Sequence, residues 1–407
     1  MESPFQLGLI EQNKRLLYME TSRGCPFRCR FCTSSEDAPR IFPIEHIQKD
    51  LEVISQMESK VVKVLDRSFH MGTGRTLKLL RAFMDTPASL RFHLELNPDR
   101  ISEDVMELFA EAPAGKFQFE IGLQTLHEES LKKIDRRMEV GKSLKNIRQL
   151  MDLKKHHVHL DLIVGLPDET AAMCEDSLNR VFTLHAHHLQ LGTLKLLPGT
   201  SLLHLAKQYG YLWDQEPPYE ILKNSTLNFQ DMMQFKKYAE LLERLWNSDL
   251  LFNCMTRLIT HYYEDQVVNF FREILVFSED KLATQHLQTD SIFTYFVDFL
   301  LEKNWLEQDS LLRELLLWDY LKLMNPSSKS HPWLREQLVF QAVSWEEADK
   351  KRFPILELSE VACEMINRRL LSPMMAGTHA LWLQVHKRGR PLKTLQLQQE
   401  LANGTIN

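Results

Sequence analysis

Three cysteines lie close together near the start of the sequence, in the segment Cys25-Pro-Phe-Arg-Cys29-Arg-Phe-Cys32. A loop with thiolates at this C-x3-C-x2-C spacing can bind three irons of a cube-shaped 4Fe–4S cluster and leave the fourth iron open. Two other interpretations stay open: a zinc site completed by a distant histidine or cysteine, and three structural thiols that bind no metal. The remaining cysteines are scattered, and we expect them to be small buried side chains: Cys174, Cys254 and Cys363.

The elements that must position this loop alternate between two sequence periods. Short stretches rich in β-branched, aromatic and leucine residues predict strands at Leu16–Ser22, Val61–Asp66, Leu90–Leu96, Lys116–Gln124, Val158–Pro167 and Leu189–Pro198. Helical spacing of apolar residues predicts helices between them at Ile44–Met57, Thr76–Met84, Glu103–Ala110, Glu128–Asp135, Leu144–Lys154 and Thr170–Leu184. These β–α units predict an α/β fold, an open, partial (β/α)6 TIM-like barrel with its site at the carboxyl ends of the strands.

A second domain is expected after a polar run that contains the adjacent prolines Pro217 and Pro218. We place the boundary after residue 214, with a barrel domain at 1–214 and a mainly helical domain at 215–407. Helical patterns cover Gln234–Trp246, Gln266–Phe277, Thr294–Glu302 and Ser310–Leu323. Strands are expected at Phe353–Leu358 and Leu381–His386. This half carries no motif that indicates chemistry.

Composition excludes several classes of protein. The 407 residues are 44% hydrophobic and 26% charged, which is ordinary for a folded protein and unlike a disordered or fibrous chain. The formal net charge of -6 argues against a general nucleic-acid partner. The first residues have no signal-peptide pattern, and no apolar stretch approaches the ~20 residues of a membrane span. We therefore expect a cytoplasmic protein without a membrane partner.

The cysteine motif, with Phe31 before the third cysteine at the opening of a β/α barrel, resembles the radical S-adenosylmethionine (SAM) superfamily. The resemblance covers roughly residues 15–205. It implies a 4Fe–4S cluster held by Cys25, Cys29 and Cys32, whose open iron chelates SAM. An electron from the cluster then cleaves SAM to a 5′-deoxyadenosyl radical that takes hydrogen from a substrate. It also implies a flavodoxin- or ferredoxin-type electron donor.

The resemblance further implies five residues that bind SAM. Asp66 stands where the superfamily holds the SAM ammonium group, and Glu95 matches an acceptor for the ribose hydroxyls in the coproporphyrinogen oxidase branch. Gln124 would lie near the ribose or the methionyl part, and Arg136 would hold the SAM carboxylate. Asp161 matches an acidic position that faces ribose or substrate. No catalytic residue is assigned.

Each of these residues also has a structural interpretation. Asp66 could pair with Arg67 at the surface, and Glu95 could be a structural acceptor at the barrel mouth. Arg136 could lie at a solvated helix end, and Asp161 could pair with a neighbouring arginine. Glu120 either points into the barrel or forms a buried salt bridge. Two groups of histidines are expected at the strand entrances, on the face opposite the chemistry, as solvated or structural side chains: His156, His157, His159, His185, His187 and His188.

Within the superfamily, three segments are most similar to proteins with an N-terminal cobalamin-binding domain: 18–26, 65–69 and 121–125. More narrowly, they resemble the group with a helical C-terminal domain of unassigned function. Only 24 residues precede the cysteine motif, and the Asp-x-His-x-x-Gly cobalamin motif is absent from the chain. Cobalamin therefore stays open as a cofactor. Its binding domain could belong to another chain or to a longer form of this one, or the protein could work without cobalamin.

The sequence thus predicts a radical SAM enzyme, an oxidoreductase or transferase whose substrate and net reaction it does not reveal. One alternative is a cobalamin-assisted methyltransferase that works with a separate cobalamin protein. Another is a non-catalytic iron–sulfur or haem-handling protein that kept the barrel. A third is RNA modification, against which the net charge and the missing second cluster motif argue.

Overall fold

The structure is a computed structural model of the chain. It describes residues 3–35, 38–69, 72–323, 330–337, 339–342, 352–357, 359–367, 380–384 and 393–394. The chain divides into two compact units, Met1–Ala239 and Glu240–Asn407. Each unit has its own core, and each is described by itself.

The first unit is built on a parallel sheet of six strands within its described residues, in the order β1-β4-β5-β6-β7-β8. The strands are β1 (Leu16–Met19), β4 (Val61–Val64), β5 (Arg91–Leu96), β6 (Phe117–Gln124), β7 (His157–Val164) and β8 (His188–Thr193). In this order β8 does not pair with β1, so the sheet is open. The predicted α/β class and the partial six-stranded barrel are confirmed.

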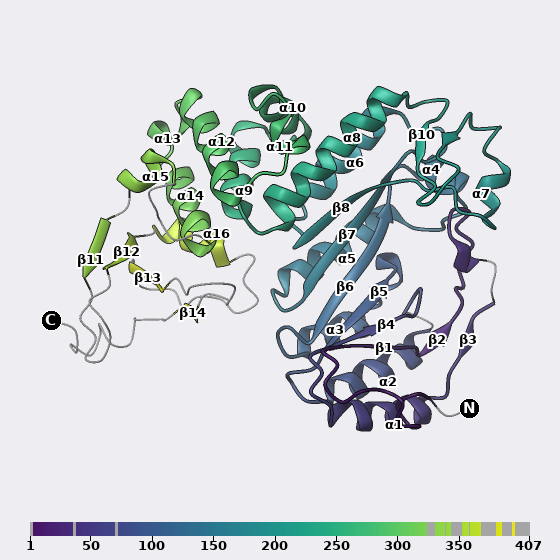
Figure 1. Cartoon of the computed structure of the whole chain (residues 1–407). Helices are drawn as coiled ribbons and strands as arrows, with labels where there is room; N and C mark the ends of the chain where they lie inside the picture. The colour runs from purple at the N-terminus through teal and green to yellow at the C-terminus, as the bar shows by residue number, and fades with distance from the viewer. Residues whose placement is uncertain are drawn as a thin grey trace. The chain divides into compact units, whose positions relative to one another are not determined.

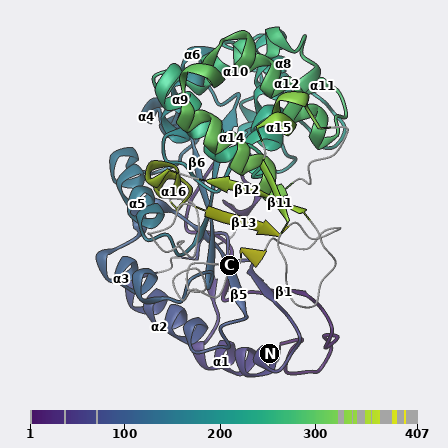
Figure 2. The ribbon, with the colours of Figure 1, turned by 90° about the vertical axis from the view of Figure 1, so that its left-hand side faces the viewer.

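Helices connect the parallel strands, as each crossover requires. They are α1 (Ile44–Ser55), α2 (Thr73–Met84), α3 (Glu103–Glu111), α4 (Glu128–Lys133), α5 (Val140–Asp152) and α6 (Ala171–Phe182). Figures 1 and 2 show α1, α2, α3 and α5 in succession along one side of the curved sheet. The apolar positions of these helices, such as Ile54, Leu80 and Ile147, are fully buried.

The two faces of the sheet differ because successive side chains of a strand point to opposite sides. In β6 the apolar residues Phe117, Phe119 and Ile121 are buried, while the alternate positions Glu120 and Gln124 stay partly exposed. The same alternation runs along β7. One face therefore forms the core with the helices, and the other carries polar side chains beside the site.

The first unit extends past residue 214, where the sequence places the domain boundary. The strands β9 (Leu212–Trp213) and β10 (Ile221–Lys223) form an antiparallel pair, and the backbones of Lys195 and Glu220 form an isolated antiparallel β-bridge. Asn224 Nδ2 donates to the Gly165 carbonyl at 3.3 Å. These contacts attach the segment after residue 214 to the barrel. The placement of a domain boundary at residue 214 stays a prediction. The helices α7 (Ser201–His204) and α8 (Phe229–Leu241) flank this segment in the chain.

Gly165, at the end of β7, is the position where the returning segment comes closest. Its φ is +101°, and an added Cβ would lie 2.1 Å from Ile221 Cδ1. We expect Gly165→Ala to lower the free energy of unfolding by about 2 kcal/mol, because it adds backbone strain and a clash. The urea midpoint measures this.

The matched control for that substitution is Gly141→Ala, in the first turn of α5. A Cβ added at Gly141 would have no heavy atom within 4 Å, and the residue has no positive φ. The control should leave the midpoint unchanged or raise it slightly, since alanine favours a helix. Equal midpoints for the two variants would contradict the close approach at Gly165.

The second unit is mainly helical within its described residues, as predicted. Its longer helices are α9 (Phe252–Tyr262), α10 (Val267–Phe277), α12 (Thr289–Glu302), α14 (Ser310–Leu323) and α16 (Glu360–Asn367). Short helices are α11 (Lys281–Thr284), α13 (Trp305–Gln308) and α15 (Pro332–Glu336), and Leu242–Asn247 is a π-helix. A described antiparallel sheet contains β11 (Val339–Ala342), β12 (Arg352–Glu357), β13 (Ala380–Gln384) and β14 (Lys393–Thr394). The two strands expected from the sequence correspond to β12 and β13.

A buried carboxylate joins two helices of the second unit. Asp319 in α14 is fully buried and accepts hydrogen bonds from Asn253 Nδ2 at 2.7 Å and from the Cys254 amide at 2.9 Å. The scattered cysteines Cys174 and Cys254 are buried, as expected, while the side chain of Cys363 lies outside the described residues. No helix in the described ranges is both long and apolar enough to span a membrane.

Candidate active site

The cysteine loop begins directly after β1 and a two-residue strand, β2 (Ser22–Arg23), which pairs with β3 (Arg40–Ile41). Gly24 has a φ of +86°, a turn conformation that glycine adopts without strain. The backbone of Arg30 fixes the loop from two sides: its amide donates to the Ile134 carbonyl, and its carbonyl accepts from the Leu202 amide, both at 2.9 Å. The loop is therefore held by the barrel rather than by regular structure of its own.

Asp66 anchors the start of this loop. Its buried carboxylate accepts hydrogen bonds from the Thr21 amide at 2.7 Å, the Thr21 hydroxyl at 2.6 Å and the Ser22 hydroxyl at 2.6 Å. Three donors occupy the carboxylate, and Asp66 does not line the cysteine cavity. It is buried rather than paired with Arg67 at the surface. Of the residues predicted to bind SAM, it is the one that the structure places apart.

The other predicted site residues come together around one cavity of about 210 Å³, which we call the cysteine cavity. Its walls come from the loop after β1 and from the carboxyl ends of β5, β6 and β7, where a parallel sheet places its site. Phe27 and Phe31 add aromatic walls. The predicted residues that line it are Cys25, Cys29, Cys32, Glu95, Gln124, Arg136 and Asp161.

The three cysteines are free thiols, Cys29 buried and Cys25 and Cys32 half-buried. Burial raises the pKa of the Cys25 and Cys29 thiols above their usual range, while the nearby Arg136 guanidinium opposes this shift. Arg136 Nη1 lies 3.6 Å from Cys29 Sγ and can donate to it. Because iron binds the thiolate, loading of a cluster would release protons here.

Arg136 lies at the centre of the site rather than at a solvated helix end. Its Nη2 donates to Asn97 Oδ1 at 3.1 Å and to the carbonyl of Gly122. These partners fix the guanidinium between the cysteine loop and the ends of β5 and β6. Its Nε is buried and has no hydrogen-bond partner in the structure. The fixed plane and the free N–H suit a ligand carboxylate.

Gly122 and Gln124 form an irregular end of β6. The pairing register with β7 shifts between them, and Gln124 has a φ of +69°, which is uncommon for a residue other than glycine. A Cβ on Gly122 would lie 2.1 Å from Gln124 Nε2. Glycine is therefore needed for the Gln124 amide to lie over the strand end, beside the cysteine cavity.

Two glutamates on neighbouring strands share the polar face of the sheet. Burial raises the pKa of Glu95, helped by the charge of Glu120, and Arg67 at 3.8 Å opposes the shift. A hydrogen bond from His93, with Nε2 2.7 Å from Oε2, lowers the pKa of Glu120 to about 2, and Lys63 at 3.4 Å helps. Glu120 thus both points into the barrel and forms an ion pair.

Asp161 pairs with a histidine, not with an arginine. His159 Nε2 lies 2.9 Å from Asp161 Oδ1, an ion-pair distance, although neither atom has hydrogen-bond geometry. His159 lies two residues before Asp161 in β7, so both point to the polar face of the sheet. His159 is the third residue of β7, near the strand entrance as expected, and its side chain lies beside Asp161, which lines the cysteine cavity. His156 does fit a structural role: it is buried, and its Nε2 lies 2.8 Å from the Phe109 carbonyl oxygen.

The residues of the cysteine cavity fit a cube-shaped cluster with a small polar ligand beside it. Three thiols from one loop face the cavity, and two buried polar atoms beside them, Arg136 Nε and Asp161 Oδ1, have no hydrogen-bond partner. Among the described residues, no three histidine, cysteine, aspartate or glutamate side chains gather as ligands of a single metal ion would.

A buried polar group lies after the carboxyl ends of β6 and β7, and the sequence does not reveal it because its members are distant in the chain. Glu169 follows β7 and accepts a hydrogen bond from the Thr125 hydroxyl at the end of β6. The Glu169 carbonyl accepts from Thr226 Oγ1 at 2.8 Å. Burial raises the pKa of Glu169 to about 7. Its place in the Gly-Leu-Pro-Asp-Glu-Thr stretch is the signal that could have drawn attention to it.

This raised pKa predicts a pH dependence of stability. The folded chain binds the Glu169 proton more tightly than the unfolded chain, whose glutamate pKa is about 4.5. The contribution is fully present below pH ~4.5 and is lost as the pH rises through ~7. The free energy of unfolding of the wild type should therefore fall between pH 5 and pH 8, and Glu169 should account for about 2–3 kcal/mol of that fall. In Glu169→Gln the fall should be smaller by this amount. Urea titrations at the two pH values measure this, with exposed Glu107→Gln as the control. An unchanged fall in Glu169→Gln would contradict the assignment.

An open β/α barrel with three cysteines at this spacing after its first strand is the architecture of radical SAM proteins. A family profile described as "Radical SAM superfamily" matches residues 19–181. A second profile, "Protein of unknown function (DUF4080)", matches residues 207–360. The match over residues 19–181 confirms the expected resemblance to the radical SAM superfamily, and the match over residues 207–360 is to a family of unassigned function, as expected. The cofactors of this superfamily are a 4Fe–4S cluster and SAM.

Two curated relatives illustrate the similarity. The cobalamin-dependent radical SAM methyltransferase TokK of Streptomyces tokunonensis is 24% identical over 228 residues, 51% of this chain and 33% of that protein. The heme chaperone HemW of Bacillus subtilis is 25% identical over 199 residues, 45% of this chain and 52% of that protein. The chain thus matches between about a third and about half of the length of these relatives.

A solved structure is also similar. The radical S-adenosylmethionine methyltransferase TsrM from Kitasatospora setae, with tryptophan substrate and a SAM analog bound, has a TM-score of 0.45 at 17% identity. The alignment covers 51% of this chain and 43% of that chain. At this TM-score the likeness adds nothing to the family assignment.

Proposed function

We propose that the chain is a radical SAM enzyme that binds its cluster through Cys25, Cys29 and Cys32 and cleaves SAM reductively. The observation that carries this proposal is the convergence of these three thiols with Arg136 on one cavity at the carboxyl ends of the strands. When bound, the cluster and SAM supply the radical chemistry, which no side chain of the barrel could supply. The substrate and the net reaction are not part of the proposal.

The side chains around the cavity bind and orient SAM in this proposal. Arg136 holds the SAM carboxylate through its free N–H, and Glu95 and Asp161 accept from the ribose hydroxyls or face the substrate. Gln124 can donate and accept beside them. Asp66 acts indirectly, as a positioning residue that holds the segment before Cys25 in place.

A second candidate is cobalamin-assisted methyl transfer, which the similarity to TokK favours. In that case cobalamin comes from a partner chain or from a longer form of this one. The two candidates differ in what becomes of SAM. Methyl transfer from SAM to cobalamin gives S-adenosylhomocysteine, whereas reductive cleavage gives 5′-deoxyadenosine.

The test is anaerobic reconstitution of the full chain with iron and sulfide, followed by SAM and dithionite. We expect about four irons per chain, as a single cube-shaped cluster requires, and 5′-deoxyadenosine as a product. A parallel assay adds cobalamin and follows the methyl group of SAM. Formation of S-adenosylhomocysteine in that assay would indicate the second candidate. Bound haem with no SAM cleavage would instead favour a haem-handling protein. Failure to form any cluster would overturn the proposal.

A further inference from the structure

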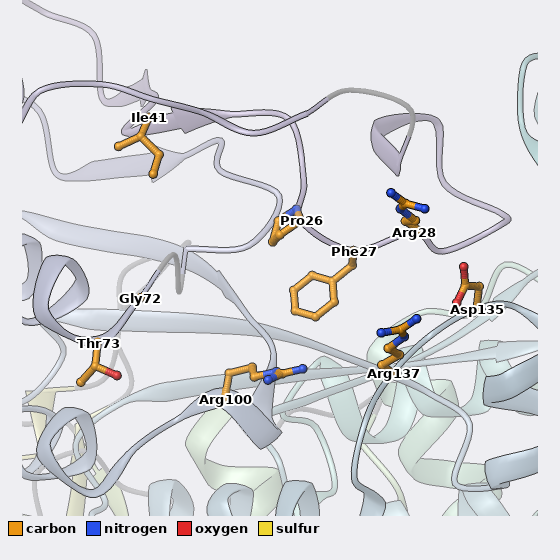
Figure 3. Close-up of a pocket in the computed structure, with 9 residues that line it drawn as sticks. All are labelled: Pro26, Phe27, Arg28, Ile41, Gly72, Thr73, Arg100, Asp135 and Arg137. Atoms are coloured by element: carbon orange, nitrogen blue, oxygen red, sulfur yellow. The ribbon is translucent and has the colours of Figure 1, made fainter.

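A second cavity borders the cysteine loop through Pro26, Phe27 and Arg28. Its volume is about 810 Å³, and its walls come from the loop, from β3, from the start of α2, and from the segments after β5 and α4. Figure 3 shows the guanidinium groups of Arg28, Arg100 and Arg137 around the ring of Phe27. We call this cavity the arginine hollow. Of the charged residues that line it, Asp135 is the acidic one.

The guanidinium groups of the arginine hollow are available to a partner. Arg28 and Arg137 are exposed and form no ion pair or hydrogen bond within the described part of the chain. Arg100 is half exposed, lies 3.7 Å from Asp99, and places its guanidinium carbon 5.8 Å from the centre of the Phe27 ring. Three cations at one hollow of the surface attract carboxylates or phosphates at long range. A chain with a net charge of -6 therefore has a local basic site here.

The position of the hollow indicates what it binds. Phe27 lines both the arginine hollow and the cysteine cavity, and Arg28 lies in the loop between Cys25 and Cys29. An occupant of the hollow would thus lie against the loop that holds the cluster. A protein that delivers electrons gains from the same position, since electron transfer slows steeply with distance.

We propose that the arginine hollow docks an acidic face of the one-electron carrier protein that reduces the cluster. This inference rests on the proposed function. One electron leaves the reduced [2Fe–2S] centre of a ferredoxin, which is oxidised, and enters the cluster held by the three cysteines, which is reduced. No bond forms or breaks, and no proton moves. Charges at the rim of such an interface act mainly on the association rate and its salt dependence.

The experiment compares two electron donors on the reconstituted full chain. An acidic plant-type ferredoxin, reduced beforehand, is one donor, and dithionite, which needs no docking, is the other. The variant is Arg100→Gln with Arg137→Gln, and the matched control is Arg81→Gln with Arg148→Gln, two exposed arginines of α2 and α5 outside the hollow. The electron paramagnetic resonance signal of the reduced 4Fe–4S cluster in rapidly frozen samples measures the rate of reduction, because the ferredoxin regains visible absorbance as the cluster loses it.

We expect the hollow variant to be reduced about five- to tenfold more slowly by ferredoxin at low salt, and the gap to close above ~0.3 M salt. The control, and reduction by dithionite, should keep the wild-type rate. Arg100→Lys with Arg137→Lys should keep most of the ferredoxin rate, because it keeps the charge.

Two results would overturn the inference: a ferredoxin rate equal to that of the control, or an equal loss with dithionite, which would indicate damage to the cluster site. Tighter binding of a small anion such as pyrophosphate in the wild type, with an unchanged ferredoxin rate, would assign the hollow to a small ligand instead. Failure of the proposed function would give a different result. Ferredoxin would then reduce the cluster, but the chain would make no 5′-deoxyadenosine.

Discussion

Replacement of any one of Cys25, Cys29 and Cys32 by alanine should abolish cluster binding and lower 5′-deoxyadenosine formation more than about a hundredfold. The physical reason is that, in the proposed site, the three thiols supply all of the protein ligands of the cluster, so that two remaining thiolates would leave a second iron open. The loop itself should persist, because the backbone of Arg30 and the carboxylate of Asp66 hold it. Iron and sulfide analysis with the anaerobic SAM assay measures both losses.

The matched control for these variants is Cys254→Ala, which removes a buried thiol of the second unit. It should keep the iron content and the rate of SAM cleavage. If a Cys29→Ala chain still bound four irons and cleaved SAM, the assignment of the cluster to this loop would be wrong. A circular dichroism spectrum unchanged from wild type shows that the variant has folded.

Arg136→Ala should weaken SAM binding about 10- to 100-fold, the effect expected from loss of a charge-assisted hydrogen-bond pair. The reason is the geometry of the guanidinium: two partners, Asn97 and the Gly122 carbonyl, hold its plane, and its buried Nε has no hydrogen-bond partner. Calorimetric titration of the reconstituted chain with SAM under anaerobic conditions gives the dissociation constant.

Three further measurements separate ligand binding from a purely structural role of Arg136. Iron content should stay at the wild-type value, since the proposed ligands of the cluster are the three cysteines and not Arg136. Arg136→Lys should recover part of the affinity through its charge but not all of it, because an ammonium cannot reproduce the planar fork. The exposed control Arg148→Ala should bind SAM as the wild type does. An unchanged dissociation constant in Arg136→Ala would restrict Arg136 to its contacts with Asn97 and Gly122.

The sequence predicts most of the fold because the relevant signals are local. The alternation in β6, with Phe117, Phe119 and Ile121 on one side, marks a strand that is half buried, and the helical spacing in Ile44–Ser55 marks a helix. Domain limits are less local. Residues after 214 join the first unit through Ile221 and Asn224, which contact Gly165 from more than fifty positions away.

The candidate site divides in the same way. Residues that belong to a motif or end a strand, such as Cys25, Glu95 and Gln124, could be predicted, because a parallel sheet brings the carboxyl ends of its strands to one edge. The sequence could not predict which of these polar groups faces the cavity. Asp66 follows the end of one strand much as Glu95 lies at the end of the next, yet the Asp66 carboxylate turns to Thr21 and Ser22.

By itself, the sequence determined the strand and helix pattern, the open barrel and the three-cysteine loop, since each depends on spacing within a few residues. Only the tertiary structure decided that Arg136 reaches the Gly122 carbonyl, that His159 faces Asp161, and that Arg28, Arg100 and Arg137 surround one hollow. Those arginines come from three separate connecting segments: the cysteine loop, the 3-10 helix Pro98–Arg100 after β5, and the segment after α4. Their convergence depends on how the loops meet after the sheet has formed, a property that no spacing along the chain encodes.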